Sequence, residues 1–204
     1  MRSARSALTL TEWVVLGVIA EQPTHGWAIV RMLRPDGVVG DVWTSSRALV
    51  YRAIHLLTEG GLIRSSGATG GKGPDRTLLA ITPEGSASLA AWLNEPVAHV
   101  RDLRSELLIK LLLLERRGLD PSGLMRRQLE RTRPIAQTLA RDVGSATGSG
   151  RSIALWRSTA AQAAIRFLVS IEAEARSQPA RSAATAGDGD RPIAALPGKH
   201  RDQA

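Results

Sequence analysis

The sequence contains no cysteine among its 204 residues, which excludes disulfide bonds and thiolate chemistry. Long apolar runs are missing too. The longest, residues 107–114, is interrupted by Lys110 and is far too short to span a bilayer. Residues 1–10 lack the apolar stretch of a signal peptide. We therefore expect a soluble, cytoplasmic protein with one or two modest domains.

The motifs of common enzyme sites are also lacking. The four histidines show no metal-binding spacing, and there is no Gly-x-Ser-x-Gly motif. The stretch 67–74 is glycine-rich, but the first glycine of a phosphate loop falls on Ser66 and its Ser/Thr position on Gly73. We predict no catalytic residue, no metal site and no cofactor. A small hydrolase or nucleotide-binding enzyme is the disfavoured alternative.

What the chain does have is positive charge. Its 27 Lys and Arg residues against 19 Asp and Glu give a formal net charge of +8. A basic balance favours an anionic partner, most commonly nucleic acid. However, arginine-rich and alanine-rich composition also fits a bias of base composition. The position of the charges therefore matters more than their total.

The first half of the chain carries the signals of a winged helix-turn-helix. The pattern predicts a helix from the Thr9–Glu12 capping box to about residue 20, a second helix at about 25–33, a third from Ser46 to Gly60–Gly61, strands at 62–66 and 77–81 joined by a turn at 67–74, and a helix capped by Thr82. Helix, helix, helix, hairpin and helix is the order of that fold.

The second half is predicted to be entirely helical. Three helices are expected at 101–117, at 121–143 with a bend at Pro134, and at 152–176. The fold class is thus mainly α with a small β-hairpin. We predict a DNA-binding domain at 1–95, a helical dimerisation and effector domain at 96–176, and a disordered tail at 177–204, where apolar residues are few.

Three ordered stretches resemble the PadR family of transcriptional regulators. "LTLTEWVVLGVIAEQPTHGWAI" looks like the family's opening helix and its His-Gly-aromatic signature. "LVYRAIHLLTEGGLI" is similar to its recognition helix, and "GPDRTLLAITPEGSASLAAWL" to its wing and the following helix. The resemblance implies a homodimeric, repressor-like regulator whose C-terminal helices supply the dimer contact. In some members, effectors lie near that interface.

The exposed side of the third helix and the wing are the candidate surface for double-stranded DNA. Periodicity places Leu49, Ala53, Ile54 and Leu57 in the core. The candidate contacts lie on the other side and on the wing: Arg47, Tyr51, Arg52, His55, Lys72 and Arg76. Residues 42–80 hold five basic and two acidic side chains. A solvated helix face, or a winged-helix module that binds proteins instead of DNA, remains the alternative.

The five tryptophans and a row of leucines complete the candidates. Trp13, Trp27 and Trp43 are expected in the core, while Trp92 and Trp156 are candidates to stack on a small aromatic or apolar effector, although packing is the commoner role. The candidate homodimer interface consists of Leu103, Leu107, Leu111, Leu114 and Phe167. The leucine row could equally be core within one chain.

Overall fold

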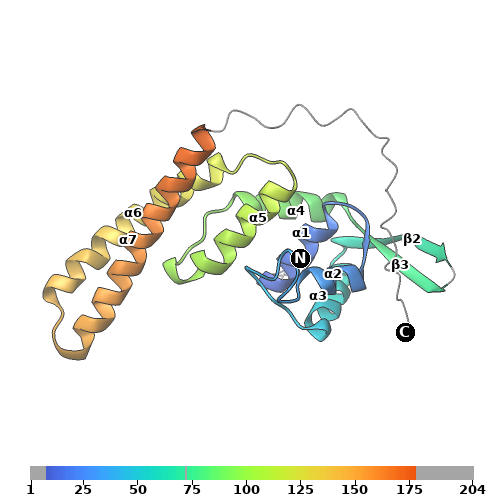
Figure 1. Cartoon of the computed structure of the whole chain (residues 1–204), viewed down its shortest axis with the longest axis horizontal. Coiled ribbons are helices and arrows are strands. Elements are labelled where there is room, and N and C mark those ends of the chain that lie inside the picture. The colour runs from blue at the N-terminus through green and yellow to red at the C-terminus, as the bar shows by residue number, and fades with distance from the viewer. Residues whose placement is uncertain (1–7, 72, 178–204) are drawn as a thin grey trace, which may run out of the picture.

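The computed structural model describes residues 8–71 and 73–177, and at 68–71, 73–76 and 175–177 it describes the backbone alone. The elements are α1 (Leu10–Ile19), β1 (Thr24–His25), α2 (Gly26–Met32), α3 (Arg47–Glu59), β2 (Ile63–Gly71), β3 (Gly73–Ile81), α4 (Pro83–Asn94), α5 (Leu108–Arg116), α6 (Ser122–Ser145) and α7 (Gly148–Ser177). The fold is mainly helical with a small antiparallel sheet, as predicted. A body carries α1–α5 and the hairpin, and the long pair α6–α7 extends away from it (Figure 1).

Local capping signals set the helix starts. The capping box of α1 is formed, because the backbone N–H of Thr9 donates to Glu12 Oε2 over 2.8 Å and that of Glu12 donates to Thr9 Oγ1 over 3.4 Å. Ser46 caps α3 and Thr82 caps α4 through their hydroxyl groups. Gly61 follows α3 with a φ of 69°, the left-handed conformation expected of it. These predictions are confirmed.

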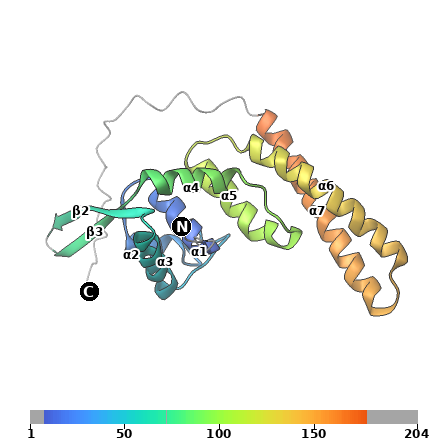
Figure 2. The ribbon, with the colours of Figure 1, turned by 180° about the vertical axis from the view of Figure 1, so that it is seen from behind.

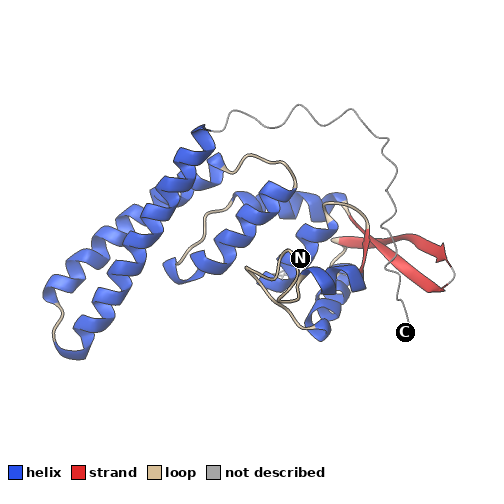
Figure 3. Cartoon of the chain, in the orientation of Figure 1, coloured by secondary structure: helices blue, strands red, loops and turns tan. Residues whose placement is uncertain are grey.

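The sheet has three strands in the order β1-β3-β2 (Figure 3). The predicted hairpin is confirmed, but the predicted turn at 67–74 is too long. The strands continue to Gly71 and resume at Gly73, because the small residues of this stretch pair in extended conformation. Gly67 has a φ of 136° at a register shift, where its missing side chain permits a bulge. Strand β1, which pairs with β3, was not predicted.

The helix predicted at 101–117 is less regular than expected. It opens with a 3₁₀ turn, η1 (Val100–Asp102), and a π-helical segment, η2 (Leu103–Leu107), before α5 begins. At its far end, Arg116 makes two hydrogen bonds with the carboxylate of Glu21, which raise the pKa of Arg116. This ion pair attaches the end of α5 to the end of α1.

The core is continuous from the winged half into the helical half. One cluster of buried side chains contains Val14 and Leu16 of α1, Leu89 of α4, Ile109 of α5 and Leu168 of α7. Three residues of the predicted dimer interface lie in this same cluster: Leu103, Leu107 and Leu114. They are core within their own chain, and Leu111 is half-buried. Only Phe167 of that set is exposed, at 37%.

Helices α6 and α7 form an antiparallel pair. Asp120 accepts hydrogen bonds from the hydroxyl and the backbone N–H of Ser122 at the start of α6, which lower the pKa of Asp120. Pro134 lies inside α6. Only residues 146–147 separate the two helices, so both extend into the gap between the helices predicted at 121–143 and 152–176. The tail predicted to be disordered lies, from residue 178 on, outside the described residues. Every helix in the described part of the chain is too short or too polar to cross a bilayer.

Candidate nucleic-acid interface

Helix α3 is anchored by one side and presents the other to solvent. Val50, Ala53 and Leu57 are buried and hold the helix against α1 and α2. The four candidate contacts on this helix are all exposed: Arg47, Tyr51, Arg52 and His55. The predicted division of the helix into a core side and an outer side is therefore found, with one exception. Leu49, expected in the core, is 49% exposed because it lies at the edge of the stripe formed by Val50, Ala53 and Leu57.

The exposed side chains of α3 are not equivalent. The guanidinium of Arg47 lies over the ring of Tyr51, 5.5 Å from its centroid, which gives both side chains a shared orientation. His55 Nε2 lies 3.4 Å from Glu59 Oε1, one turn further on. A carboxylate beside His55 disfavours the approach of a phosphate at that end of the helix. The positive part of the surface is thus the N-terminal half of α3.

The wing stands next to this helix. The chain turns from α3 into β2 through Gly60–Gly61, and the backbone N–H of Leu62 donates to the carbonyl of Leu57. Arg64 on β2 is exposed. Of the predicted wing contacts, Lys72 lies outside the described residues and the side chain of Arg76 is likewise outside them. Seen from behind, the hairpin projects from the body close to α2 and α3 (Figure 2).

Of the three tryptophans predicted in the core of this half, Trp13 and Trp43 are half-buried. Trp13 stacks on Trp92, with ring centroids 4.9 Å apart and planes 5° from parallel. Trp43 donates from its indole nitrogen to Thr11 Oγ1 over 3.2 Å. Trp27, however, is 54% exposed, because Ile29 and Leu33 already fill the contact between α2 and the core. The prediction that Trp27 lies in the core is therefore wrong.

A second feature is a cleft of about 1030 Å³ between the chain leading into α5 and the pair α6–α7. Its walls include the apolar side chains of Leu107, Ile135, Trp156 and Phe167. Three arginines border it: Arg101, Arg104 and Arg157. The two effector candidates differ here, because Trp156 lines the cleft and is 74% exposed, whereas Trp92 is buried under Trp13. Within the described residues, no cluster of three His, Asp or Glu side chains is arranged to hold a metal ion.

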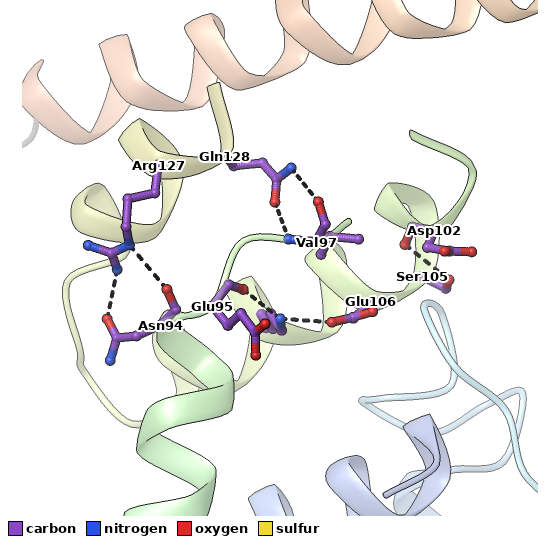
Figure 4. A network of polar contacts seen from close by, with 9 residues as sticks. Asn94, Glu95, Val97, Asp102, Ser105, Glu106, Arg127 and Gln128 are labelled. Atoms are coloured by element: carbon purple, nitrogen blue, oxygen red, sulfur yellow. Dashed lines mark hydrogen bonds and ion pairs between the residues drawn. The ribbon is translucent and has the colours of Figure 1, made fainter. Parts of the chain in front are cut away.

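Polar contacts fix the junction between the winged half and α6 (Figure 4). The side-chain amide of Gln128, which is buried, accepts from the backbone N–H of Val97 over 2.6 Å and donates to its carbonyl over 3.1 Å. Arg127 donates to the backbone carbonyl and the side chain of Asn94. We call the two hydrogen bonds between Gln128 and the backbone of Val97 the Gln128 clamp. The cleft wall begins at Ala98, the residue after Val97.

A buried lysine supports the same junction. Lys110 is 1% exposed, and its ammonium donates to the carbonyl of Glu95 over 2.7 Å and pairs with Glu106 at 2.8 Å. It also lies 4.7 Å from the ring centroid of Trp92. The aromatic stack on α1 and α4 is thereby joined to the segment that forms the cleft wall.

Comparison with known proteins agrees with this architecture. Residues 15–91 match the model of the transcriptional regulator PadR-like family. A probable transcriptional regulator of Mycobacterium tuberculosis, Rv1176c, is 29% identical over 94 residues, which are 46% of this chain and 49% of that protein, so the chain spans about half the length of this relative.

Solved structures give further matches at lower similarity. Bacillus subtilis PadR in complex with operator DNA is 18% identical, with a TM-score of 0.42 over 82% of this chain and 99% of that one. The PadR-like regulator BC1756 of Bacillus cereus is 20% identical, with a TM-score of 0.39 over 85% and 99%. The winged-helix half of this chain, over residues 15–91, is thus similar to the PadR-like family of transcriptional regulators.

Proposed function

We propose that this protein is a sequence-specific DNA-binding regulator that acts as a homodimeric repressor. The observation that carries the proposal is the outer side of α3, where Arg47, Tyr51 and Arg52 are exposed on a helix held firmly by its inner side. A helix of this kind fits the major groove, and arginine recognises guanine edges and phosphates. The adjoining hairpin then reaches the flanking phosphates.

Dimerisation is proposed through the α6–α7 pair. Apolar side chains remain uncovered along α7, and they are Ile153, Leu155, Trp156, Phe167 and Val169. Apolar surface of this extent on one helix is typically covered by another protein surface. A second copy is the occupant that regulation requires, because two recognition helices related by twofold symmetry read two half-sites. The interface thus uses the exposed apolar side chains of α7 rather than the buried leucine row.

Release by a small molecule is proposed at the cleft. Its apolar walls with Trp156 suit a small aromatic or apolar compound, and the bordering Arg101, Arg104 and Arg157 favour one that carries a carboxylate. Such a ligand would touch the segment that follows the Gln128 clamp. It would therefore bias the orientation of α6 relative to the winged half.

The test is a binding titration against the DNA immediately upstream of the protein's own gene, with a scrambled fragment as the control. Specific binding should exceed binding to the scrambled fragment by about a thousandfold at physiological salt. Replacing Arg52 by alanine should weaken specific binding by at least about tenfold, which is about 1.4 kcal/mol. Arg34→Ala, which removes the same charge from an exposed position outside α3, is the matched control and should bind as the wild type does.

Two results would contradict the proposal. Equal binding of the wild type to both fragments would leave only backbone attraction. Absence of binding to either fragment at low salt would favour a protein-binding winged-helix module instead.

A further inference from the structure

Trp27 is a large aromatic side chain that lies outside the core. It is 54% exposed at the first turn of α2, while Ile29 and Leu33 are fully buried and attach the helix to the body. Tryptophan is enriched in binding surfaces because one side chain supplies a large contact area and an N–H donor at low entropic cost. Its exposure here leaves it available for a contact outside the chain.

Arg31 stands one helical turn beyond Trp27 and is held by it. The guanidinium carbon lies 5.0 Å from the ring centroid of Trp27, and Arg31 is itself exposed. The next arginine along the chain, Arg34, instead pairs with Asp36 at 3.3 Å. The stack orients the charge of Arg31 and lowers the rotamer entropy that it would lose on binding.

The pair on α2 has a counterpart on α3. Arg47 and Tyr51 show the same combination, an arginine over an aromatic ring at a spacing of four residues, with 5.5 Å to the centroid. Each of the two helices of the helix-turn-helix therefore carries one exposed aromatic ring with an arginine above it. On both helices, positive charge and aromatic surface face solvent together.

The two pairs belong to one region of the surface. Gly26 allows α2 to approach α3, since a Cβ at this position would lie 3.0 Å from Cε1 of Tyr51 and 3.2 Å from Cδ1 of Ile54. The preceding residue, His25, lies in β1 opposite Leu78 of the wing strand β3. Residues 25–27 thus lie between the wing and α3. Helix α2 is beside α3 in both views (Figures 1 and 2).

We propose that Trp27 and Arg31 form a second contact with the DNA, on the sugar–phosphate backbone at the edge of the groove that α3 enters. The inference rests on the proposed DNA-binding function. In helix-turn-helix proteins the helix before the recognition helix crosses the backbone. A phosphodiester accepts hydrogen bonds from the guanidinium of Arg31 and the indole N–H of Trp27. The positive charges of Arg31, Arg47 and Arg52 favour this polyanion over a protein partner.

The experiment measures operator affinity at four salt concentrations for the wild type and three variants. Because the proposed dimer presents Arg31 twice, Arg31→Ala should weaken binding about tenfold and lower the slope of log K against log salt by about 1.8, which is about 0.9 for each of two phosphates. Trp27→Phe should weaken binding by about threefold without changing the slope, since it removes a neutral donor. Arg34→Ala is the matched control on the same segment, and its affinity should equal that of the wild type.

A backbone contact has a further signature. Arg31→Ala should weaken binding to operator and to scrambled DNA by the same factor, so the specificity ratio is unchanged. A loss confined to the operator would overturn the backbone assignment. If Arg31→Ala and Trp27→Phe, with wild-type circular dichroism, keep wild-type affinity and slope, the contact itself is overturned. Those outcomes leave operator binding intact, whereas a wild type that binds no operator overturns the proposed function and this inference with it.

Discussion

Gly85, in the first turn of α4, lies where the structure leaves no room for a side chain larger than hydrogen. A Cβ there would collide with the backbone carbonyl oxygen of Leu62, which also accepts from the backbone N–H of Thr82. Because the obstacle is backbone at the base of the wing, a side-chain rotation cannot relieve the collision. The junction of β2, β3 and α4 therefore requires glycine at 85.

We predict that Gly85→Ala lowers the free energy of unfolding by about 1–3 kcal/mol, the range of overpacked cores. Gly144→Ala is the matched control, since nothing lies within 4 Å of a Cβ at that helical position. It should be neutral or stabilise by up to about 1 kcal/mol through helix propensity. Urea unfolding at one protein concentration measures both. Equal stabilities of the two variants would contradict the predicted collision.

Residues with local roles were predictable, and residues with distant partners were not. Thr9, Ser46 and Thr82 cap helices through atoms three residues away, so the sequence alone identifies them. The exposure of Trp27 and the burial of Trp92 depend instead on which helices pack together. Hydrophobicity alone predicts burial for both tryptophans. Only the tertiary fold determines which of them is exposed.

At the scale of elements, the same distinction explains the sheet and the leucine row. The hairpin was predictable because β2 and β3 are neighbours in the chain. Strand β1 was not, since its two residues pair with a strand more than fifty residues away. Periodicity showed that Leu103, Leu107 and Leu114 share a face, but it could not show that their own chain covers that face.

The attachment of α6 to the winged half gives a prediction at this scale. Replacing Gln128 by leucine keeps the volume similar but leaves the N–H and the carbonyl of Val97 without their buried partner. Each unsatisfied buried group costs about 1–3 kcal/mol. We therefore expect Gln128→Leu to lower the free energy of unfolding by about 2–6 kcal/mol, the sum for the two groups, measured by urea denaturation.

Gln137→Leu is the control for this change, because Gln137 is exposed on the same helix. Its stability should stay within about 0.5 kcal/mol of the wild type. A Gln128 variant as stable as the Gln137 variant would show that water or a rearranged backbone satisfies Val97. The clamp would then have no part in holding α6.

At the scale of the whole molecule, the continuous core and the long α6–α7 pair have different roles. The core makes α1–α5 one body and fixes α3 and the wing relative to each other. The pair projects from that body (Figure 1), and α7 carries five exposed large apolar side chains within its described residues. A change at the cleft, between the two parts, would move the outward pair relative to the DNA-binding helix. Repression and its release are proposed to depend on this geometry.

Trp156 provides the test of dimerisation, because it is the most exposed large apolar side chain of α7. We predict that Trp156→Glu raises the Kd of the dimer by at least about thirtyfold, equivalent to about 2 kcal/mol, as expected for a central interfacial tryptophan. Light scattering should then give the monomer mass at concentrations where the wild type is a dimer. Operator affinity should fall as well, since two half-sites would no longer be held by one particle.

Leu119→Glu places the same charge at an exposed leucine in the loop between α5 and α6, away from α7. This control should remain a dimer and bind operator as the wild type does. A Trp156 variant that stays dimeric would remove α7 from the interface, and a wild type that is monomeric at every concentration would remove the dimer itself. In the second case each recognition helix would act alone, and the footprint on the operator would cover one half-site without twofold symmetry.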